Sequence, residues 1–193
     1  MVNKKSKARF ILLGVASIFI IPILVSWYLV FFTEFKKDDG GTQKGEIISP
    51  VISLGDLEVY DIKNDATSSI NDKWTLVFFV ESECNQSCED KLYQVRQIRL
   101  ALGKDRDQVD RLLVSGKIQS WEVFSDSFNG QKYIDPRSKS YAELVKKFEE
   151  YPKFDARGTY LVDPFGFLMM KYKFDANPMG TIKDIERLIK NQK

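Results

Sequence analysis

Two cysteines four residues apart are the side chains with the most evident chemistry in this sequence. They are Cys84 and Cys88, the only cysteines of the chain, with Asn, Gln and Ser between them. Thiols at this spacing share one face of a helix, and they can close a disulfide if Cys84 lies just before the first helical turn. Such a pair can exchange electrons with other thiols, hold a soft cation such as Cu(I), or act as a structural crosslink.

All three roles stay open from the residues alone, although the redox and Cu(I) roles are favoured. A loop this short removes only about 2 kcal/mol of chain entropy from the unfolded state, so a structural crosslink would contribute little. The start of a helix lowers the pKa of a thiol. Four acidic residues flank the pair, which disfavours a thiolate and favours a soft cation: Glu81, Glu83, Glu89 and Asp90.

The absence of histidine excludes several classes of site. The 193 residues contain none. A Ser-His-Asp triad, a Cys-His nucleophile pair, a His-ligated haem and a zinc site with imidazole ligands are therefore impossible. With two cysteines, an all-thiolate zinc or iron–sulfur site within one chain is also excluded. If the chain is an enzyme, it is at most a thiol–disulfide oxidoreductase.

A long uncharged segment near the N-terminus predicts a membrane anchor. Residues 10–32 carry no charge, and at about 1.5 Å per residue they are long enough to cross a hydrocarbon core of roughly 30 Å. Before this run stand four basic residues and no acid, whereas acids outnumber bases just after it. The positive-inside rule then places residues 1–9 in the cytoplasm as a basic tail.

The predicted organisation follows from this anchor. We expect a transmembrane helix over residues 10–32, a polar glycine-rich linker over 33–45 and one folded domain over 46–193. In a bacterium the protein would be a single-pass protein of the inner (cell) membrane, with its domain in the periplasm. The net charge of +2 gives no reason to expect nucleic acid as a partner.

The elements that position the cysteines are a strand and the helix after it. Residues 74–80 (WTLVFFV) read as a strand buried on both faces. We expect a helix from between Cys84 and Cys88 to Gly103, with Leu92 and Val95 on its inward stripe. The cysteines would then lie at one edge of the sheet, where α/β proteins often hold their chemistry.

The remaining elements complete an α/β fold. One or two strands are expected over 46–62, a strand over 109–114, and a short strand over 121–124. Ser140 with Glu143 predicts a capping box that opens a helix through Glu150. Strands over 159–162 and 168–172 flank an Asp-Pro-Phe-Gly turn. A last helix is expected to be capped by Thr181. This order predicts a mixed sheet flanked by helices.

Two further groups of residues were given structural interpretations. The charge run of Arg106, Asp107, Asp110 and Arg111 predicts a solvated edge. The methionines Met169, Met170 and Met179 are expected to fill the core.

The sequence around the cysteines resembles the Sco proteins, the thioredoxin-fold assembly factors for the copper centre of cytochrome c oxidase. The resemblance rests on residues 74–103, with the CxxxC between strand and helix, and on residues 159–172 (TYLVDPFGFLMMKY). It implies a thioredoxin-like α/β fold behind an N-terminal transmembrane helix.

The resemblance also implies site residues. That family binds copper through two cysteines, matched here by Cys84 and Cys88, and one histidine. The position of the histidine is occupied here by Asp155, and a carboxylate is a hard ligand that suits Cu(I) poorly. Cu(I) is thus a possible cofactor held by the two thiolates, with Met169, Met170 or Met179 as an alternative source of a further ligand.

The hypothesis from the sequence is a membrane-anchored, periplasm-facing protein of cytochrome c oxidase biogenesis. Its CxxxC pair would serve thiol redox or transient Cu(I) handling, and its partner would be a membrane-bound oxidase subunit or another assembly factor. Two alternatives are a general periplasmic thiol–disulfide oxidoreductase and a non-catalytic assembly scaffold that has lost metal binding.

Overall fold

The computed structural model describes residues 4–32, 43–63, 66–80, 84–117 and 128–192, and within 4–32 it describes the side chains of 13–28 only. The chain divides into two compact units, Met1–Thr42 and Gln43–Lys193. The strand predicted over 121–124 and the acids Glu81 and Glu83 lie outside the described residues.

In the first unit the described residues form one helix, α1 (Lys4–Phe32), with Pro22 inside it. It covers the segment predicted to span a membrane. Among the described residues, however, the structure has no helix with the length and apolar character that a membrane crossing requires.

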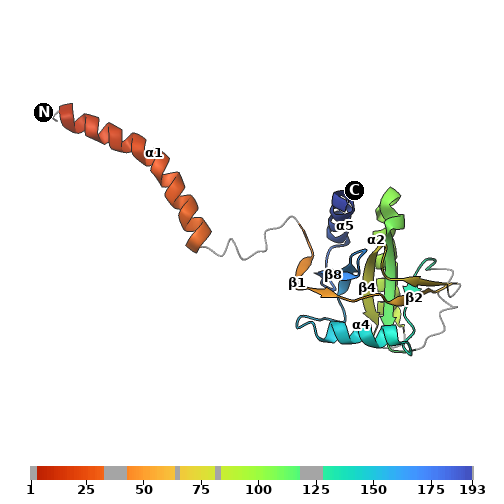
Figure 1. Cartoon of the computed structure of the whole chain (residues 1–193). Coiled ribbons are helices and arrows are strands. Elements are labelled where there is room, and N and C mark those ends of the chain that lie inside the picture. The colour runs from red at the N-terminus through yellow and green to blue at the C-terminus, as the bar shows by residue number, and fades with distance from the viewer. Residues whose placement is uncertain (1–3, 33–42, 64–65, 81–83, 118–127, 193) are drawn as a thin grey trace. The chain divides into compact units, whose positions relative to one another are not determined.

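The second unit is built on one mixed sheet (Figure 1). Within the described residues eight strands pair in the order β1-β8-β7-β4-β5-β6-β2-β3. Strand β4 pairs in parallel with β5 and antiparallel with β7, so the strand before the cysteines is central. The strands are β1 (Glu46–Ser53), β2 (Glu58–Asp61), β3 (Thr67–Ser69), β4 (Trp74–Val80), β5 (Val109–Ser115), β6 (Lys132–Tyr133), β7 (Thr159–Val162) and β8 (Phe167–Tyr172).

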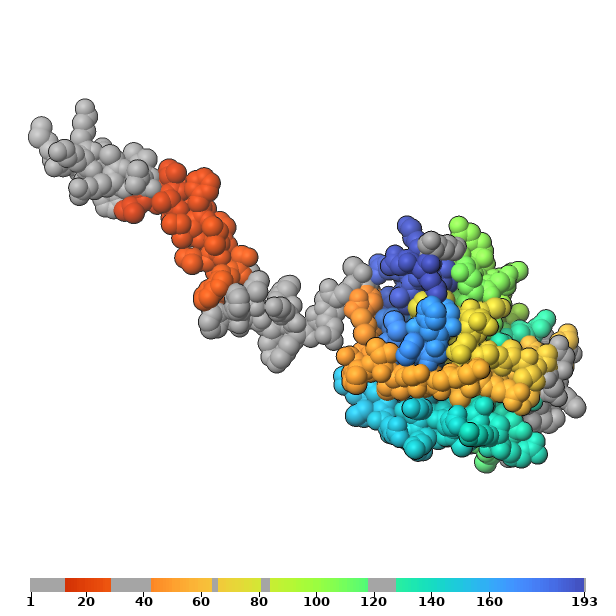
Figure 2. All heavy atoms as spheres, in the orientation of Figure 1, coloured from red at the N-terminus to blue at the C-terminus, as the bar shows by residue number. Residues whose placement is uncertain are grey.

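Helices cover both faces of this sheet. α2 (Gln86–Ala101) and α5 (Pro178–Gln192) pack on one face, and α4 (Lys139–Glu149) packs on the other. In the space-filling view α2 (green) and α5 (dark blue) lie on one side of the orange and yellow strands, and α4 (cyan) lies on the other (Figure 2). A short 3-10 helix, η2 (Gly103–Gln108), joins α2 to β5.

Strand β4 separates two hydrophobic clusters. Because side chains alternate along a strand, Leu76 and Phe78 face the cluster under α2 and α5, while Val77 faces the cluster under α4. Every buried member of both clusters belongs to the second unit, so this unit holds a complete core of its own.

Two predicted helix starts were wrong. α4 is capped by Ser138, whose Oγ accepts a hydrogen bond from the amide of Tyr141 at 3.1 Å, and not by Ser140. α5 begins at Pro178, where Asn177 Oδ1 accepts from the amide of Met179 at 2.9 Å. Thr181 lies inside α5, buried. In both regions an earlier side chain takes the capping role.

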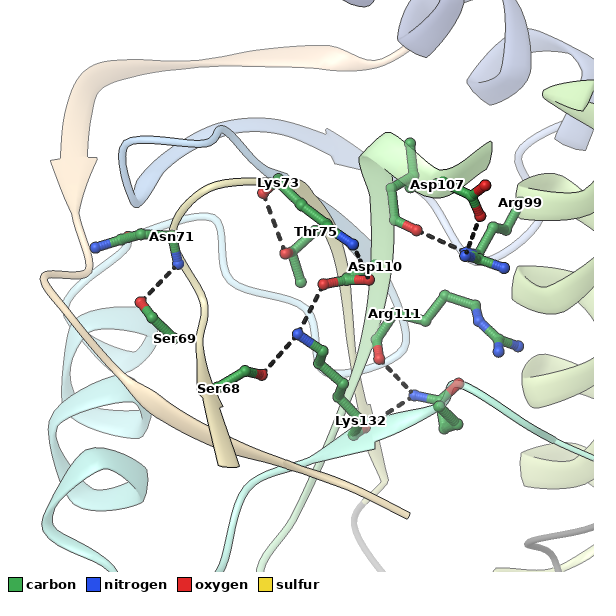
Figure 3. Close-up of polar contacts among 12 residues, drawn as sticks. Ser68, Ser69, Asn71, Lys73, Thr75, Arg99, Asp107, Asp110, Arg111 and Lys132 are labelled. Carbon is green, nitrogen blue, oxygen red and sulfur yellow. Dashed lines mark hydrogen bonds and ion pairs between the residues drawn. The ribbon is translucent and has the colours of Figure 1, made fainter. Parts of the chain in front are cut away.

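The prediction of a solvated edge was wrong for Arg111. Its side chain is buried, and its guanidinium donates to the carbonyl of Asn129 at 2.7 Å. Asp110 is held by Lys132 at 2.7 Å, and Lys132 also donates to Ser68 at 2.7 Å (Figure 3). Two residues of the charge run, Asp110 and Arg111, thus lie in strand β5, whose two faces are covered, whereas Arg106 and Asp107 lie in η2 and are exposed as predicted.

Burial disfavours the charged form of a basic side chain, and it lowers the pKa of the Arg111 guanidinium to about 10. Met170 is buried in the core as predicted, whereas Met179 is exposed, so the expectation of core filling was wrong for Met179.

Candidate functional site

Cys84 and Cys88 form a disulfide at the junction of β4 and α2. Their Cα atoms are 5.1 Å apart, within the range that a disulfide requires. α2 begins at Gln86, which confirms a helix start between the two cysteines. Cys84 therefore precedes the first turn while Cys88 lies within it, and this lets the two sulfurs meet.

The cap of α2 holds Cys88 in place. Asn85 is the N-cap, and its Oδ1 accepts a hydrogen bond from the amide of Cys88 at 3.2 Å. The carbonyl of Asn85 accepts from the amide of Glu89 at 3.0 Å. Capping of this kind satisfies amides that have no partner within the helix. The sequence-based prediction of α2 did not include Asn85 as its cap.

The two sulfurs differ in exposure. Cys88 is 7% exposed and belongs to the core cluster that contains Leu92 and Val95. Cys84 is only partly buried and packs against the same cluster. An attacking thiol must be reached by its substrate, so Cys84 is the better placed of the two to react with another protein.

A cleft of about 180 Å³ lies beside Cys88, and we name it the redox cleft. Helix α2 contributes Cys88 and Lys91 to it, one helical turn apart. Its described lining residues are Phe79, Val80, Asn85, Ser87, Cys88, Lys91, Ala156, Arg157 and Phe174. The cleft thus combines apolar and cationic side chains next to the disulfide.

Asp155 lies next to the redox cleft but outside its lining. Its Oδ1 accepts from the amide of Arg157 at 3.1 Å and lies 3.5 Å from the Nε of the same residue. The phenol of Tyr160 donates to the Asp155 carbonyl at 3.0 Å. The fold therefore brings the loop of Asp155 to the cysteines, and the carboxylate is engaged by Arg157.

The other lining residues of the cleft were not predicted from the sequence. Lys91 was detectable in principle, because it follows Cys88 by three residues and helical neighbours at that spacing share a face. Arg157 and Phe174 come from segments far away in the sequence. No local pattern indicates that they meet Cys88.

Comparison with known proteins places residues 74–191 within the family model described as a transmembrane-like, thioredoxin-like, C-terminal domain. No curated protein matches the sequence significantly.

Solved structures of similar fold include the following three. ScoI of Bradyrhizobium japonicum with copper bound is 22% identical, with a TM-score of 0.52 over 70% of this chain and 98% of its own. A SCO1/SenC family lipoprotein from Bacillus anthracis str. Ames is 15% identical, with a TM-score of 0.56 over 72% and 95%. BsSco, described with a disulfide switch as a member of the Sco family of cytochrome c oxidase assembly proteins, is 13% identical, with a TM-score of 0.54 over 72% and 94%. These likenesses confirm the predicted thioredoxin-like fold.

Copper in one of these relatives makes the donor set of this chain worth testing. Two cysteine sulfurs are present, and Asp155 is a hard oxygen donor already bound by Arg157. Among the described residues, no three or more His, Cys, Asp or Glu side chains are grouped so that they could hold a metal ion. The residues therefore do not fit a three-ligand copper site.

Proposed function

The chain belongs to the transmembrane-like, thioredoxin-like family that its residues 74–191 match, and from this premise we propose that it is a thiol–disulfide protein of cytochrome c oxidase biogenesis. The observation that carries the proposal is the Cys84–Cys88 disulfide, which joins a partly exposed sulfur to a buried one beside an open cleft. A pair with one reachable and one shielded sulfur suits exchange with a partner protein.

The proposed reaction starts from the dithiol form, which another dithiol protein regenerates. The thiolate of Cys84 attacks a disulfide of the partner, a mixed disulfide forms, and one partner thiolate leaves. Cys88 then attacks the sulfur of Cys84, which closes the disulfide seen here and releases the second partner thiolate. The partner gains two electrons and two protons, and Cys84 and Cys88 lose them.

The link to the oxidase rests on the relatives. BsSco, which shares the fold, is described as having a disulfide switch and as belonging to a family of cytochrome c oxidase assembly proteins. The partner in our proposal is accordingly a membrane-bound oxidase subunit or another assembly factor that carries a cysteine pair. A general thiol–disulfide oxidoreductase and a non-catalytic scaffold are the outcomes that the experiments below must separate from it.

Anchoring in the inner membrane, with the domain on the periplasmic side, is part of the proposal. It is supported by the uncharged residues 10–32 with their basic flank and by the transmembrane-like description of the family. The full chain should stay in the membrane fraction after an alkaline carbonate wash. Alkaline phosphatase fused after residue 45 should be active. Release by the wash, or an inactive fusion, would contradict this location.

A redox titration tests the chemistry. The second unit, residues 43–193, is equilibrated with mixtures of reduced and oxidised glutathione, and the free thiols are counted by alkylation and mass spectrometry. We expect one reversible two-electron transition that Cys84→Ser and Cys88→Ser both abolish. Tight one-to-one binding of Cu(I) by the reduced protein, lost in Cys84→Ser, would contradict a purely redox role.

A test in cells separates the three functions. In cells that lack the gene, cytochrome c oxidase activity should fall and should return with the wild-type gene but not with Cys84→Ser. Restoration by the serine variant would favour the scaffold. Unchanged oxidase activity, together with loss of disulfide reduction in other exported proteins, would favour a general oxidoreductase.

A further inference from the structure

The redox cleft carries an ammonium group close to the disulfide. The Nζ of Lys91 lies 5.4 Å from the centre of the Phe174 ring, a distance at which a cation interacts with an aromatic face. Both residues line the cleft together with Cys88. The contact with the Phe174 ring thus keeps the ammonium group of Lys91 on the side of α2 that faces the cleft.

Lys91 has no ion-pair partner among the residues that the structure describes. Its side chain is partly buried, and burial lowers its pKa, while the charge of Asp155 acts in the opposite direction. Two acids lie close to Lys91 in sequence. The carboxylate of Asp90 accepts a hydrogen bond from the side-chain amide of Gln86 at 3.0 Å. Glu89 is not among the described residues that line the cleft. No carboxylate of the described residues therefore forms an ion pair with Lys91, so its ammonium group can pair with an acidic side chain of a bound segment.

Arg157 adds a second positive charge at the rim. Its side chain is 78% exposed, and its pairing with Asp155 at 3.5 Å offsets part of its charge. The described lining of the cleft contains no carboxylate. The charges of the described lining thus favour the binding of a negatively charged side chain.

The rest of the lining is mainly apolar, with Asn85 and Ser87 as its uncharged polar residues, and the cleft is small. Phe79, Val80 and Ala156 contribute to it, and Phe174 is 50% exposed. The volume of about 180 Å³ lies below the roughly 300 Å³ at which pockets for small ligands begin. The cleft is therefore suited to one or two side chains of a protein segment and not to a free cofactor.

We propose that the redox cleft selects the partner by binding the segment next to its reacting cysteine, with an apolar side chain against Phe174 and an acidic side chain at Lys91. This inference rests on the proposed function, because the segment is brought to the cleft by the exchange at Cys84. The charge pair would fix the register of the segment and raise the rate of encounter.

Three synthetic peptides test the proposal. Each contains one internal disulfide and a Leu beside the reacting cysteine, and they differ only in the next residue, which is Asp, Asn or Lys. The full chain, reduced and purified in a non-ionic detergent, is mixed with each peptide, and the second-order rate of disulfide exchange is measured. We expect the Asp peptide to react roughly fivefold faster than the Lys peptide at low salt, as for one exposed charge pair. The difference should shrink at 0.5 M salt, where charges are screened within about 4 Å.

Variants at one position assign the effect to Lys91. Lys91→Gln should abolish the preference for Asp, whereas Lys91→Arg, which keeps the charge, should retain it. The control is Lys104→Gln, because Lys104 is an exposed lysine on η2, beyond the opposite end of α2 from Cys88. It makes the same change in net charge and should leave the preference unaltered.

The outcomes separate the inference from the proposed function. Equal rates for the three peptides, or an unchanged preference in Lys91→Gln, would overturn the role of the cleft while the redox function stands. No exchange with any peptide would overturn both.

Discussion

Reduction of the Cys84–Cys88 disulfide should destabilise the fold only slightly. The two residues are four positions apart in sequence, so the crosslink closes a loop of about five residues. In the chain-entropy description such a loop removes roughly 7 cal/mol/K from the unfolded state, or about 2 kcal/mol at 25 °C. A crosslink that closed a loop of 100 residues would contribute about 4.7 kcal/mol.

The same free energy appears in the reduction potential. By the thermodynamic cycle of folding and reduction, a disulfide that stabilises the fold is harder to reduce in the folded protein by the same amount. About 2 kcal/mol corresponds to roughly 45 mV for a two-electron couple. The folded second unit should therefore have a potential about 45 mV below that of the same pair in the urea-unfolded chain.

The assay is urea unfolding of residues 43–193 followed by circular dichroism, with and without reductant. The oxidised form should exceed the reduced form by about 2 kcal/mol in its free energy of unfolding, with equal dependence on urea. The double serine variant at both cysteines is the control and should match the reduced form. A loss above roughly 4 kcal/mol, or unfolding on reduction, would refute the reasoning and indicate a structural crosslink.

Three further predictions concern the helix cap, the core and buried phenols. Asn85→Ala should lower the free energy of unfolding by about 1 kcal/mol and shift the reduction potential of the adjacent disulfide, because Asn85 accepts a hydrogen bond from the amide of Cys88. The control Ser138→Ala, at the cap of α4, should lower the free energy of unfolding equally and leave the reduction potential unchanged. Equal reduction potentials in both variants would contradict a role for the cap. Phe148→Ala should lower the free energy of unfolding in urea by about 3–5 kcal/mol, because the Phe148 ring is fully buried against the rings of Phe79 and Tyr160. A loss below about 1 kcal/mol would mean that the three rings are not packed as described. Burial raises the pKa of Tyr160 to about 12, and it also raises the pKa of Tyr172. Because the unfolded phenols ionise first, the free energy of unfolding should fall above pH 10, with Tyr160 alone contributing up to about 1.4 kcal/mol per pH unit. Tyr160→Phe should reduce the slope by that share in urea titrations at several pH values.

The fold was predictable where a local pattern coincides with packing. Residues 74–80 are apolar except for Thr75, because β4 lies at a central position in the sheet and is covered on both faces. The β7–β8 hairpin follows from its turn residues, and the amide of Gly166 donates to the carbonyl of Asp163 at 3.0 Å. In these segments sequence and tertiary structure require the same residues.

The wrong predictions concern residues whose positions depend on contacts with distant parts of the sequence. Arg111 was expected in solvent, but the strand that carries it runs beneath α2, and the carbonyl of Asn129 accepts from its guanidinium. Ser138 and Ser140 are equally good capping residues by type, and only the backbone path selects Ser138.

One part of the candidate site was predictable from the sequence, and the other part was not. Cys84 and Cys88 were found from their spacing, because both lie at one junction of a strand and a helix. The redox cleft was not found, because Arg157 and Phe174 reach Cys88 only through the pairing of β7 with β4 and β8. Because the cleft is assembled from three segments of the chain, no single segment carries a sequence pattern that predicts it.

The central claim, that Cys84 is the sulfur that exchanges with a partner, is tested most directly by trapping the mixed disulfide. The reduced Cys88→Ser and Cys84→Ser variants are each mixed with a disulfide peptide, quenched by alkylation and analysed by intact-mass spectrometry. Our account predicts that Cys88→Ser accumulates a one-to-one adduct through Cys84, since no second thiol remains to release the peptide, and that Cys84→Ser forms little. Equal adducts in both variants, or none in either, would contradict it.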